Sequence, residues 1–159
     1  MENTADFSSL SLSPHVQRSV DKAFELLSRY LHQPGVAFTS TDVAKDWLCL
    51  RMAGREREEF MVLYLNHQNQ VLAWETLFTG SISSTEVHPR EVVKRALYFN
   101  AAAVILAHNH PSGDIAPSKS DKVITQRLIQ ALGLVDVRFL DHFIVGGGKI
   151  ASFDEDGLL

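Results

Sequence analysis

The spacing of apolar residues divides the chain into helical and strand-like segments. From Ser13-Pro14 onward an apolar residue recurs every three or four positions, which predicts a helix that ends before Gln33-Pro34-Gly35. A second, shorter helix is expected after Thr39-Ser40-Thr41 and continues to about Met52. The apolar stripe of the first helix consists of Val16, Val20, Ala23, Phe24, Leu27 and Leu31.

The middle of the chain changes to the period of strands. Residues 59–66 and 71–80 are rich in β-forming side chains and flank a polar turn, so they predict a hairpin. An extended connection over 81–91 leads into a helix over 89–100. The following run, 101–108, is continuously apolar, which is typical of a strand buried on both faces.

The C-terminal part predicts another helix and a second pair of strands. Residues 118–133 have helical spacing and end at Gly133, and residues 135–153 indicate a strand, a glycine turn and a return strand. This order of elements predicts an α+β fold, a three-layer α/β/α domain with a central mixed sheet. We divide the chain into a flexible tail (1–12), a helical N-terminal segment (13–52) and the main domain (53–159).

Composition and charge narrow the classes of function. The 159 residues suffice for one self-supporting core, and the net charge of −4 gives no basic surface for general nucleic-acid binding. A single cysteine, Cys49, excludes an intramolecular disulfide and fits a reducing compartment. The N-terminus has no secretory signal pattern, and no apolar run reaches the roughly 20 residues that span a bilayer. We therefore expect a cytoplasmic protein with no membrane partner.

Two histidines end the apolar run, within the stretch "LAHNHPSGDIAPSKSD". On a strand, His108 and His110 point to the same side about 7 Å apart, a separation at which both can bind one Zn²⁺. The chain then turns, and Asp121 in the first turn of the next helix could return as a third ligand. Two histidines, a carboxylate and a position left for water are the pattern of catalytic zinc, whereas structural zinc takes four protein ligands.

Each part of this pattern also has a purely structural interpretation. Ser118 and Asp121 have the S-x-x-D spacing of a helix capping box, and the histidines could be solvated residues at a strand end. For Asp121 alone, capping is the stronger interpretation. The joint pattern H-x-H-x7-S-x-x-D at a strand–loop–helix junction is far more specific than either part.

The joint pattern resembles the motif of the JAMM (MPN+) metalloproteases at every defined position. The stretches around it, "HPREVVKRALYFNAAAVILAHNHPSGDIAPSKSD" and "LDHFIVG", resemble the RadC-like (UPF0758) branch of that superfamily, over about residues 57–153. Full-length RadC proteins carry a longer N-terminal region similar to a helix-hairpin-helix module, and this sequence is more similar to the short forms without it. The resemblance implies a cytidine-deaminase-like JAMM domain.

The resemblance also implies a role for each matching residue. Ser118 would hydrogen-bond the water or the developing oxyanion, and an upstream glutamate would act as general base. Among the three candidates we choose Glu58, because R-E-x-F at 57–60 resembles the family pattern, while Glu56 and Glu59 stay open. The implied Zn²⁺ ligands are His108, His110 and Asp121.

The pair Asp141-His142 lies within the last long predicted strand. If these side chains are buried they need polar partners, and a contact with one of the metal ligands is a further expectation.

The leading hypothesis is a zinc-dependent metallohydrolase, a metallopeptidase or isopeptidase that cleaves an amide bond of a peptide or protein. One alternative is a non-catalytic binding module on the same fold. Another is a DNA-repair accessory protein, which the RadC name implies and the acidic charge argues against. The substrate and the oligomeric state, including a homodimer, stay open.

Overall fold

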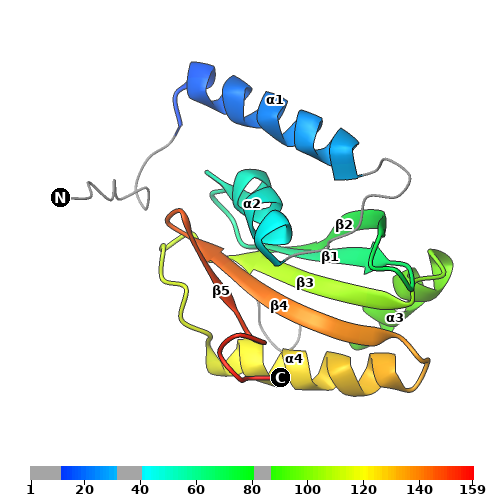
Figure 1. Ribbon diagram of the computed structural model, residues 1–159. Coiled ribbons are helices and arrows are strands. Elements are labelled where there is room, and N and C mark those ends of the chain that lie inside the picture. Colours follow the sequence, from blue (N-terminus) through cyan, green and yellow to red (C-terminus); the bar gives the residue numbers. More distant parts are fainter. Residues whose placement is uncertain (1–11, 32–40, 81–86) are drawn as a thin grey trace.

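The computed structural model describes residues 12–31, 41–80 and 87–159 of the chain, so nearly all of the predicted tail (1–12) lies outside the described residues. At its centre is a five-stranded sheet with the order β2-β1-β3-β4-β5 (Figure 1). All neighbouring strands are antiparallel except β3 and β4, which are parallel. The strands are β1 (Glu59–Leu65), β2 (Val71–Thr79), β3 (Ala103–Asn109), β4 (Arg138–Gly146) and β5 (Lys149–Ser152).

Helices cover both faces of the sheet. Helices α1 (Pro14–Leu31) and α2 (Thr41–Met52) lie on one side, and α3 (Pro89–Tyr98) and α4 (Lys119–Gly133) lie on the other (Figure 1). The predicted α+β fold with three layers and a central mixed sheet is therefore confirmed.

The central strand β3 is buried along its whole length, as its continuous apolar run predicted. Successive side chains of a strand point to opposite faces. The odd-numbered residues accordingly pack in the core under α2, and Val104 and Leu106 pack with residues of α3 and α4. By the same alternation, His108 belongs to the face that α4 covers.

The connection between β3 and β4 brings distant parts of the sequence together. Because these strands are parallel, the chain must cross over the sheet between them, and α4 is that crossover. The loop after β3 therefore delivers the N-terminus of α4 to the carboxyl end of β3. In sheets of this kind, ligands bind outside the carboxyl ends of parallel strands.

Several element ends differ from the sequence prediction. The strand predicted from residue 101 begins at Ala103, because Asn100 has a positive φ of 52° and the Ala101 amide still donates to Ala96 of the preceding helix. The strand predicted from residue 135 begins at Arg138, because Asp136, with a φ of 59°, belongs to the turn that leaves α4. In both places the helix exit is longer than the apolar pattern indicated.

Only part of the apolar stripe predicted on α1 is buried. Phe24 and Leu27 are half-buried against the core under α2, and the Phe24 ring lies 5.5 Å from that of Trp47. Val16 is 43% exposed and Ala23 is also exposed. Helix α1 is thus a peripheral element of this layer. None of the helices in the described ranges combines the length and apolarity needed to cross a bilayer.

Candidate metal centre

The two histidines lie at the carboxyl end of β3. His108 is fully buried near the end of the strand, while His110 lies one residue beyond it. The His110 amide still donates to Val145 of β4 at 2.8 Å, so the chain has not yet left the sheet. The turn brings the two imidazoles together, and their Nε2 atoms are 2.8 Å apart.

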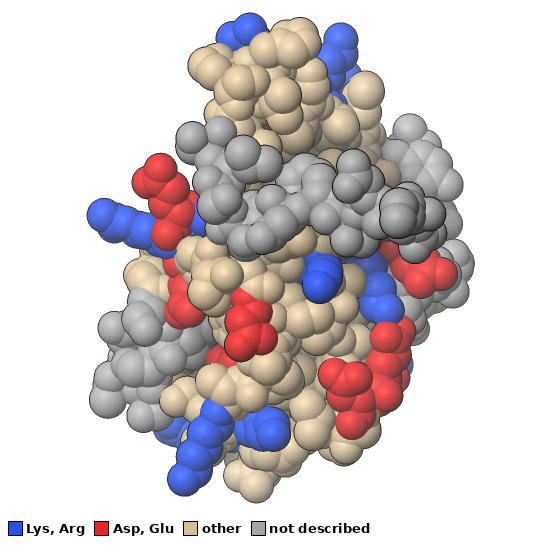
Figure 2. Space-filling model, turned by 90° about the vertical axis from the view of Figure 1, so that its left-hand side faces the viewer, with Lys and Arg blue, Asp and Glu red and all other residues tan. Residues whose placement is uncertain are grey.

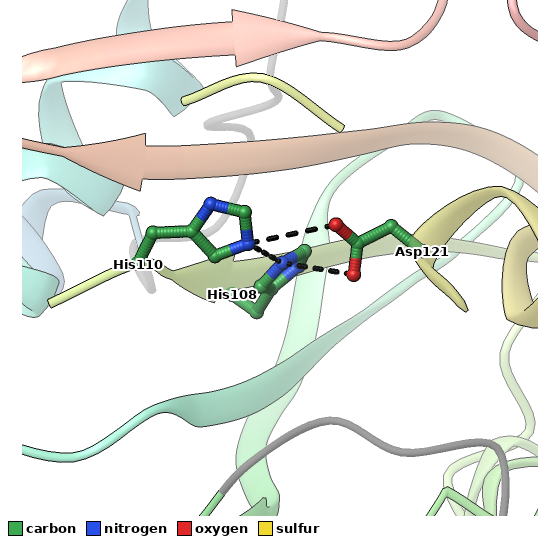
Figure 3. A group of neighbouring side chains, drawn as sticks. All are labelled: His108, His110 and Asp121. Carbon is green, nitrogen blue, oxygen red and sulfur yellow. Dashed lines mark hydrogen bonds and ion pairs between the residues drawn. The ribbon is translucent and has the colours of Figure 1, made fainter. Parts of the chain in front are cut away.

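The loop after β3 fixes the orientation of His110. Its Nδ1 lies 2.5 Å from the backbone carbonyl of Asp114. A carbonyl oxygen only accepts hydrogen bonds, so Nδ1 carries the proton and donates it. In the neutral ring, Nε2 then holds a lone pair directed at His108 and Asp121 (Figure 3).

Asp121 is aimed by the cap of α4. Ser118 Oγ accepts a hydrogen bond from the Asp121 amide at 3.0 Å, and Asp121 Oδ2 accepts one from the Ser118 amide at 2.8 Å. The two carboxylate oxygens also lie 3.3 Å from His108 Nε2 and 3.5 Å from His110 Nε2 (Figure 3). The capping box, which was the structural alternative to a metal site, is therefore present. It holds the same carboxylate against the histidines.

Removing this cap should cost measurable stability. Ser118→Ala deletes the acceptor for the Asp121 amide, and loss of a serine cap typically lowers the free energy of unfolding by about 1 kcal/mol. Urea unfolding followed by circular dichroism measures the difference. Ser120→Ala, within the same helical turn, is the matched control, and equal stability of the two variants would contradict the assignment.

The electrostatics of the cluster favour a positive charge at the point where the three side chains converge. Burial opposes ionisation of Asp121, but the neighbouring imidazoles of His108 and His110 outweigh this and hold the carboxyl pKa well below its usual range. The hydrogen bond to Asp121 in turn raises the pKa of His110, against the effect of burial. One donor atom from each of the three residues lies within 4.8 Å of the others, so His108, His110 and Asp121 could hold a metal ion.

The structure separates the three candidate glutamates. Glu58 immediately precedes β1, whose Phe60 pairs with His108 and packs on the face that α4 covers. Its charge contributes to the raised pKa of His110. Glu59 is directed to the other face, where its carboxylate lies 3.6 Å from Arg51, and Glu56 is exposed.

Asn109, between the two histidines, anchors the backbone around Glu58. Its side-chain oxygen accepts a hydrogen bond from the Glu59 amide at 2.7 Å, and its side-chain nitrogen donates to the Arg57 carbonyl at 2.9 Å. Asn109 is only 4% exposed. The alternation of side chains along a strand directs Asn109 away from His108, and these two contacts agree with that orientation.

The expected contact of the Asp141-His142 pair is present for His142. His142 Nε2 lies 2.8 Å from His108 Nδ1, and His142 Nδ1 lies 2.7 Å from Thr125 Oγ1. Burial lowers the pKa of His142 well below its usual value, so the ring is neutral. Asp141 instead accepts hydrogen bonds from Ser152 and from the Asp154 amide. Thr125 was missed, because its only sequence signal is a position one helical turn after Asp121.

A cavity of about 750 Å³ opens beside the cluster. His110 contributes to its wall, together with Asn109 and the glycine turn between β4 and β5. Other parts of the wall come from α1 and the end of α2, and much of the lining is apolar. Its side chains from the two helices include Val16, Val20, Cys49 and Met52.

Comparison with known proteins agrees with this architecture. The family model described as a RadC-like JAB domain matches residues 38–158. The chain belongs to the RadC-like JAB domain family. Two relatives from Escherichia coli (strain K12) are similar over nearly their full length. UPF0758 protein YfjY is 73% identical over 143 residues, covering 90% of this chain and 89% of the relative. UPF0758 protein YeeS is 65% identical over 148 residues, covering 93% and 100%.

Membership of the RadC-like family confirms the resemblance seen in the sequence. It supports a JAMM-type metal-binding fold, and the His-His-Asp cluster lies in the structure where the sequence motif predicted it. The roles predicted for Glu58 and Ser118 remain predictions.

Proposed function

We propose that this protein is a zinc-dependent metallohydrolase that cleaves an amide bond of a peptide or protein. The observation that carries the proposal is the convergence of two imidazole Nε2 atoms and one carboxylate on a single point. Zinc prefers this combination of nitrogen and oxygen donors, and three protein ligands are the number found at catalytic sites. When bound, zinc supplies Lewis acidity that activates water and polarises a carbonyl group.

Two further side chains have positions that suit the reaction. Glu58 immediately precedes β1 and its charge acts on His110, so we assign its carboxylate the role of accepting a proton from the attacking water and passing it to the leaving amine. Ser118 Oγ already accepts a hydrogen bond from the Asp121 amide, which leaves its hydroxyl hydrogen for donation. We assign that hydrogen to the oxygen of the carbonyl under attack.

Asn109 should control the position of Glu58. In Asn109→Ala, the Arg57 carbonyl and the Glu59 amide lose their shared partner, so the backbone that carries Glu58 loosens. Small misplacements of a reacting group cost up to about 100-fold in rate. We expect kcat to fall by about 10- to 100-fold with unchanged zinc content, measured on the folded variant. An unchanged kcat would contradict this role.

The apolar cavity beside His110 indicates where part of the substrate binds. A peptide whose scissile bond lies at the metal centre could place a neighbouring apolar side chain between α1 and the glycine turn. On the face shown in Figure 2, basic and acidic side chains are interspersed and form no continuous basic surface. This face therefore suits a peptide better than a polyanion. Cys49, a free cysteine, agrees with an activity in the reducing cytoplasm.

A substrate screen tests the proposal directly. Fluorogenic peptides and lysine-ε-linked isopeptides, each with apolar or acidic residues beside the scissile bond, are incubated with the zinc-loaded protein. We expect hydrolysis that is faster for the apolar series and is abolished by a chelator and restored by added zinc. Cleavage that continues in the presence of the chelator would contradict the proposal.

A further inference from the structure

A buried network of hydrogen-bonded side chains lies behind the proposed metal ligands and has no part in the reaction proposed above. His142 of β4 and Thr125 of α4 are both 0% exposed, and they connect His108 to the backbone of Asp121. We propose that Thr125 and His142 are positioning residues that hold His108 in the one tautomer able to bind a metal through Nε2. This inference rests on the proposed function.

The Asp121 carbonyl, the final acceptor of this hydrogen-bond network, determines where each proton of the network lies. Thr125 Oγ1 lies 2.7 Å from the Asp121 carbonyl, which can only accept, so the single hydroxyl hydrogen is donated there. The oxygen of Thr125 must then accept from His142 Nδ1 at 2.7 Å. Because His142 is fully buried against Phe60 and Phe153 with no anionic partner among the described residues, its ring is neutral, so Nδ1 carries its one proton and Nε2 is an acceptor.

The proton position on His142 in turn determines the proton position on His108. Because His142 Nε2 can only accept, the hydrogen bond of 2.8 Å is donated by His108 Nδ1. His108 Nε2 is then left with a lone pair, and this is the atom 3.3 Å from Asp121 Oδ1. A backbone carbonyl on α4 thus decides which nitrogen of a residue on β3 is available to a metal.

Packing keeps the His142 ring from leaving this arrangement. The ring stacks on Phe153 with centroids 4.5 Å apart and an interplanar angle of 27°. Phe60 contacts it in a T-shaped arrangement, with centroids 6.1 Å apart. Both aromatic residues are buried, so neither ring has room to turn away.

The same hydrogen-bond network also joins two of the proposed ligands, His108 and Asp121. Thr125 is one helical turn after Asp121, so its hydrogen bond to the Asp121 carbonyl lies within α4, while its contact with His142 reaches the sheet. His108 and the first turn of α4 are therefore held at a fixed separation by buried polar contacts. Partners of this kind both fix the tautomer of a metal-binding histidine and orient its ring.

The informative variant is Thr125→Val, which keeps the branched shape and removes the hydroxyl. His142 Nδ1 then has lost its acceptor, so the ring is free to carry its proton on Nε2 and donate to His108 Nδ1. His108 would in turn carry its proton on Nε2, where it blocks metal binding. Loss of such a partner typically weakens metal binding 10- to 100-fold, and we expect a loss of about that size for Zn²⁺ in competition with a chromogenic chelator.

Matched variants separate positioning from stability. Thr125→Ser keeps the hydroxyl and should restore zinc affinity to within a few-fold of wild type. His142→Gln keeps an acceptor and a donor and should bind zinc more tightly than His142→Leu, which keeps neither. Ser152→Ala removes another buried hydrogen bond, to Asp141 beside His142, and should lower stability without changing zinc affinity.

The histidine tautomers of the metal-free protein give a second readout. Long-range ¹H–¹⁵N spectra should show the His108 proton on Nδ1 in the wild type and on Nε2 in Thr125→Val. Zinc affinity that is equal in wild type, Thr125→Val and His142→Leu, all folded, would overturn this inference alone. A wild-type protein that binds no zinc would contradict the proposed function, whereas the tautomer spectra would still decide whether His108 is held as described.

Discussion

His110→Ala is expected to abolish stoichiometric zinc binding while the protein stays folded. His110 lies beyond the end of β3 and outside both apolar cores, so its loss leaves the packing intact. It supplies one of only two nitrogen donors in the cluster. Because losing a partner of a ligand already costs 10- to 100-fold, we expect loss of the ligand itself to weaken zinc binding by more than about 100-fold. Isothermal titration calorimetry measures the affinity.

The control for this variant is His67→Ala, which removes an exposed histidine from the turn between β1 and β2. It should bind zinc as the wild type does. Circular dichroism and the melting temperature of the metal-free proteins establish that both variants are folded. Equal zinc affinity of His110→Ala and wild type would show that His110 is not a ligand.

Glu58→Gln is expected to lower kcat/KM for the peptide cleaved best by about 10²- to 10⁴-fold, the usual contribution of a general base. Glutamine has nearly the same shape but accepts no proton at neutral pH. The zinc content should not change, because Glu58 is not among the clustered donors. Steady-state kinetics on the zinc-loaded variant, together with metal analysis of the same sample, test both parts.

The neighbouring glutamates are the matched controls. Glu59→Gln breaks the ion pair with Arg51 on the opposite face and should reduce stability while leaving kcat/KM within a few-fold of wild type. Glu56→Gln changes an exposed residue in the wall of the cavity. If Glu56→Gln loses activity and Glu58→Gln keeps it, the base has been assigned to the wrong residue.

The elements of this fold could be predicted because their signals are local. The period of apolar residues gave the helices and strands to within a few residues, and the buried run before His108 marked the central strand. The ends were less accurate, because Asn100 and Asp136 adopt positive φ values that extend each helix exit without any change of polarity. The exposure of Val16 in α1 could not be predicted, since an apolar stripe does not reveal how much surface lies opposite it.

The metal cluster was predictable from the sequence for a different reason. His108, His110 and Asp121 lie within 14 residues, so a strand, a turn and a helix cap suffice to bring them together. The capping box and the metal cluster seemed to be alternatives, yet a carboxylate has two oxygens and several lone pairs, so Asp121 serves both.

The surroundings of the cluster depend on pairing between distant strands, which the sequence alone did not supply. The parallel pairing of β3 with β4 places His142 directly beside Leu106 and within reach of His108. The antiparallel pairing of β1 with β3 brings the start of β1, and with it Glu58, to the end of β3 that carries His108. Thr125 and Asn109 became visible only through their hydrogen bonds.

The most direct test of the central claim is the metal content of the wild-type protein, purified without an affinity tag or added metal and measured by mass spectrometry. We predict close to one zinc per chain. Absence of zinc in the folded protein, persisting after dialysis against zinc, would contradict it and would leave Ser118 and Asp121 with the helix cap alone.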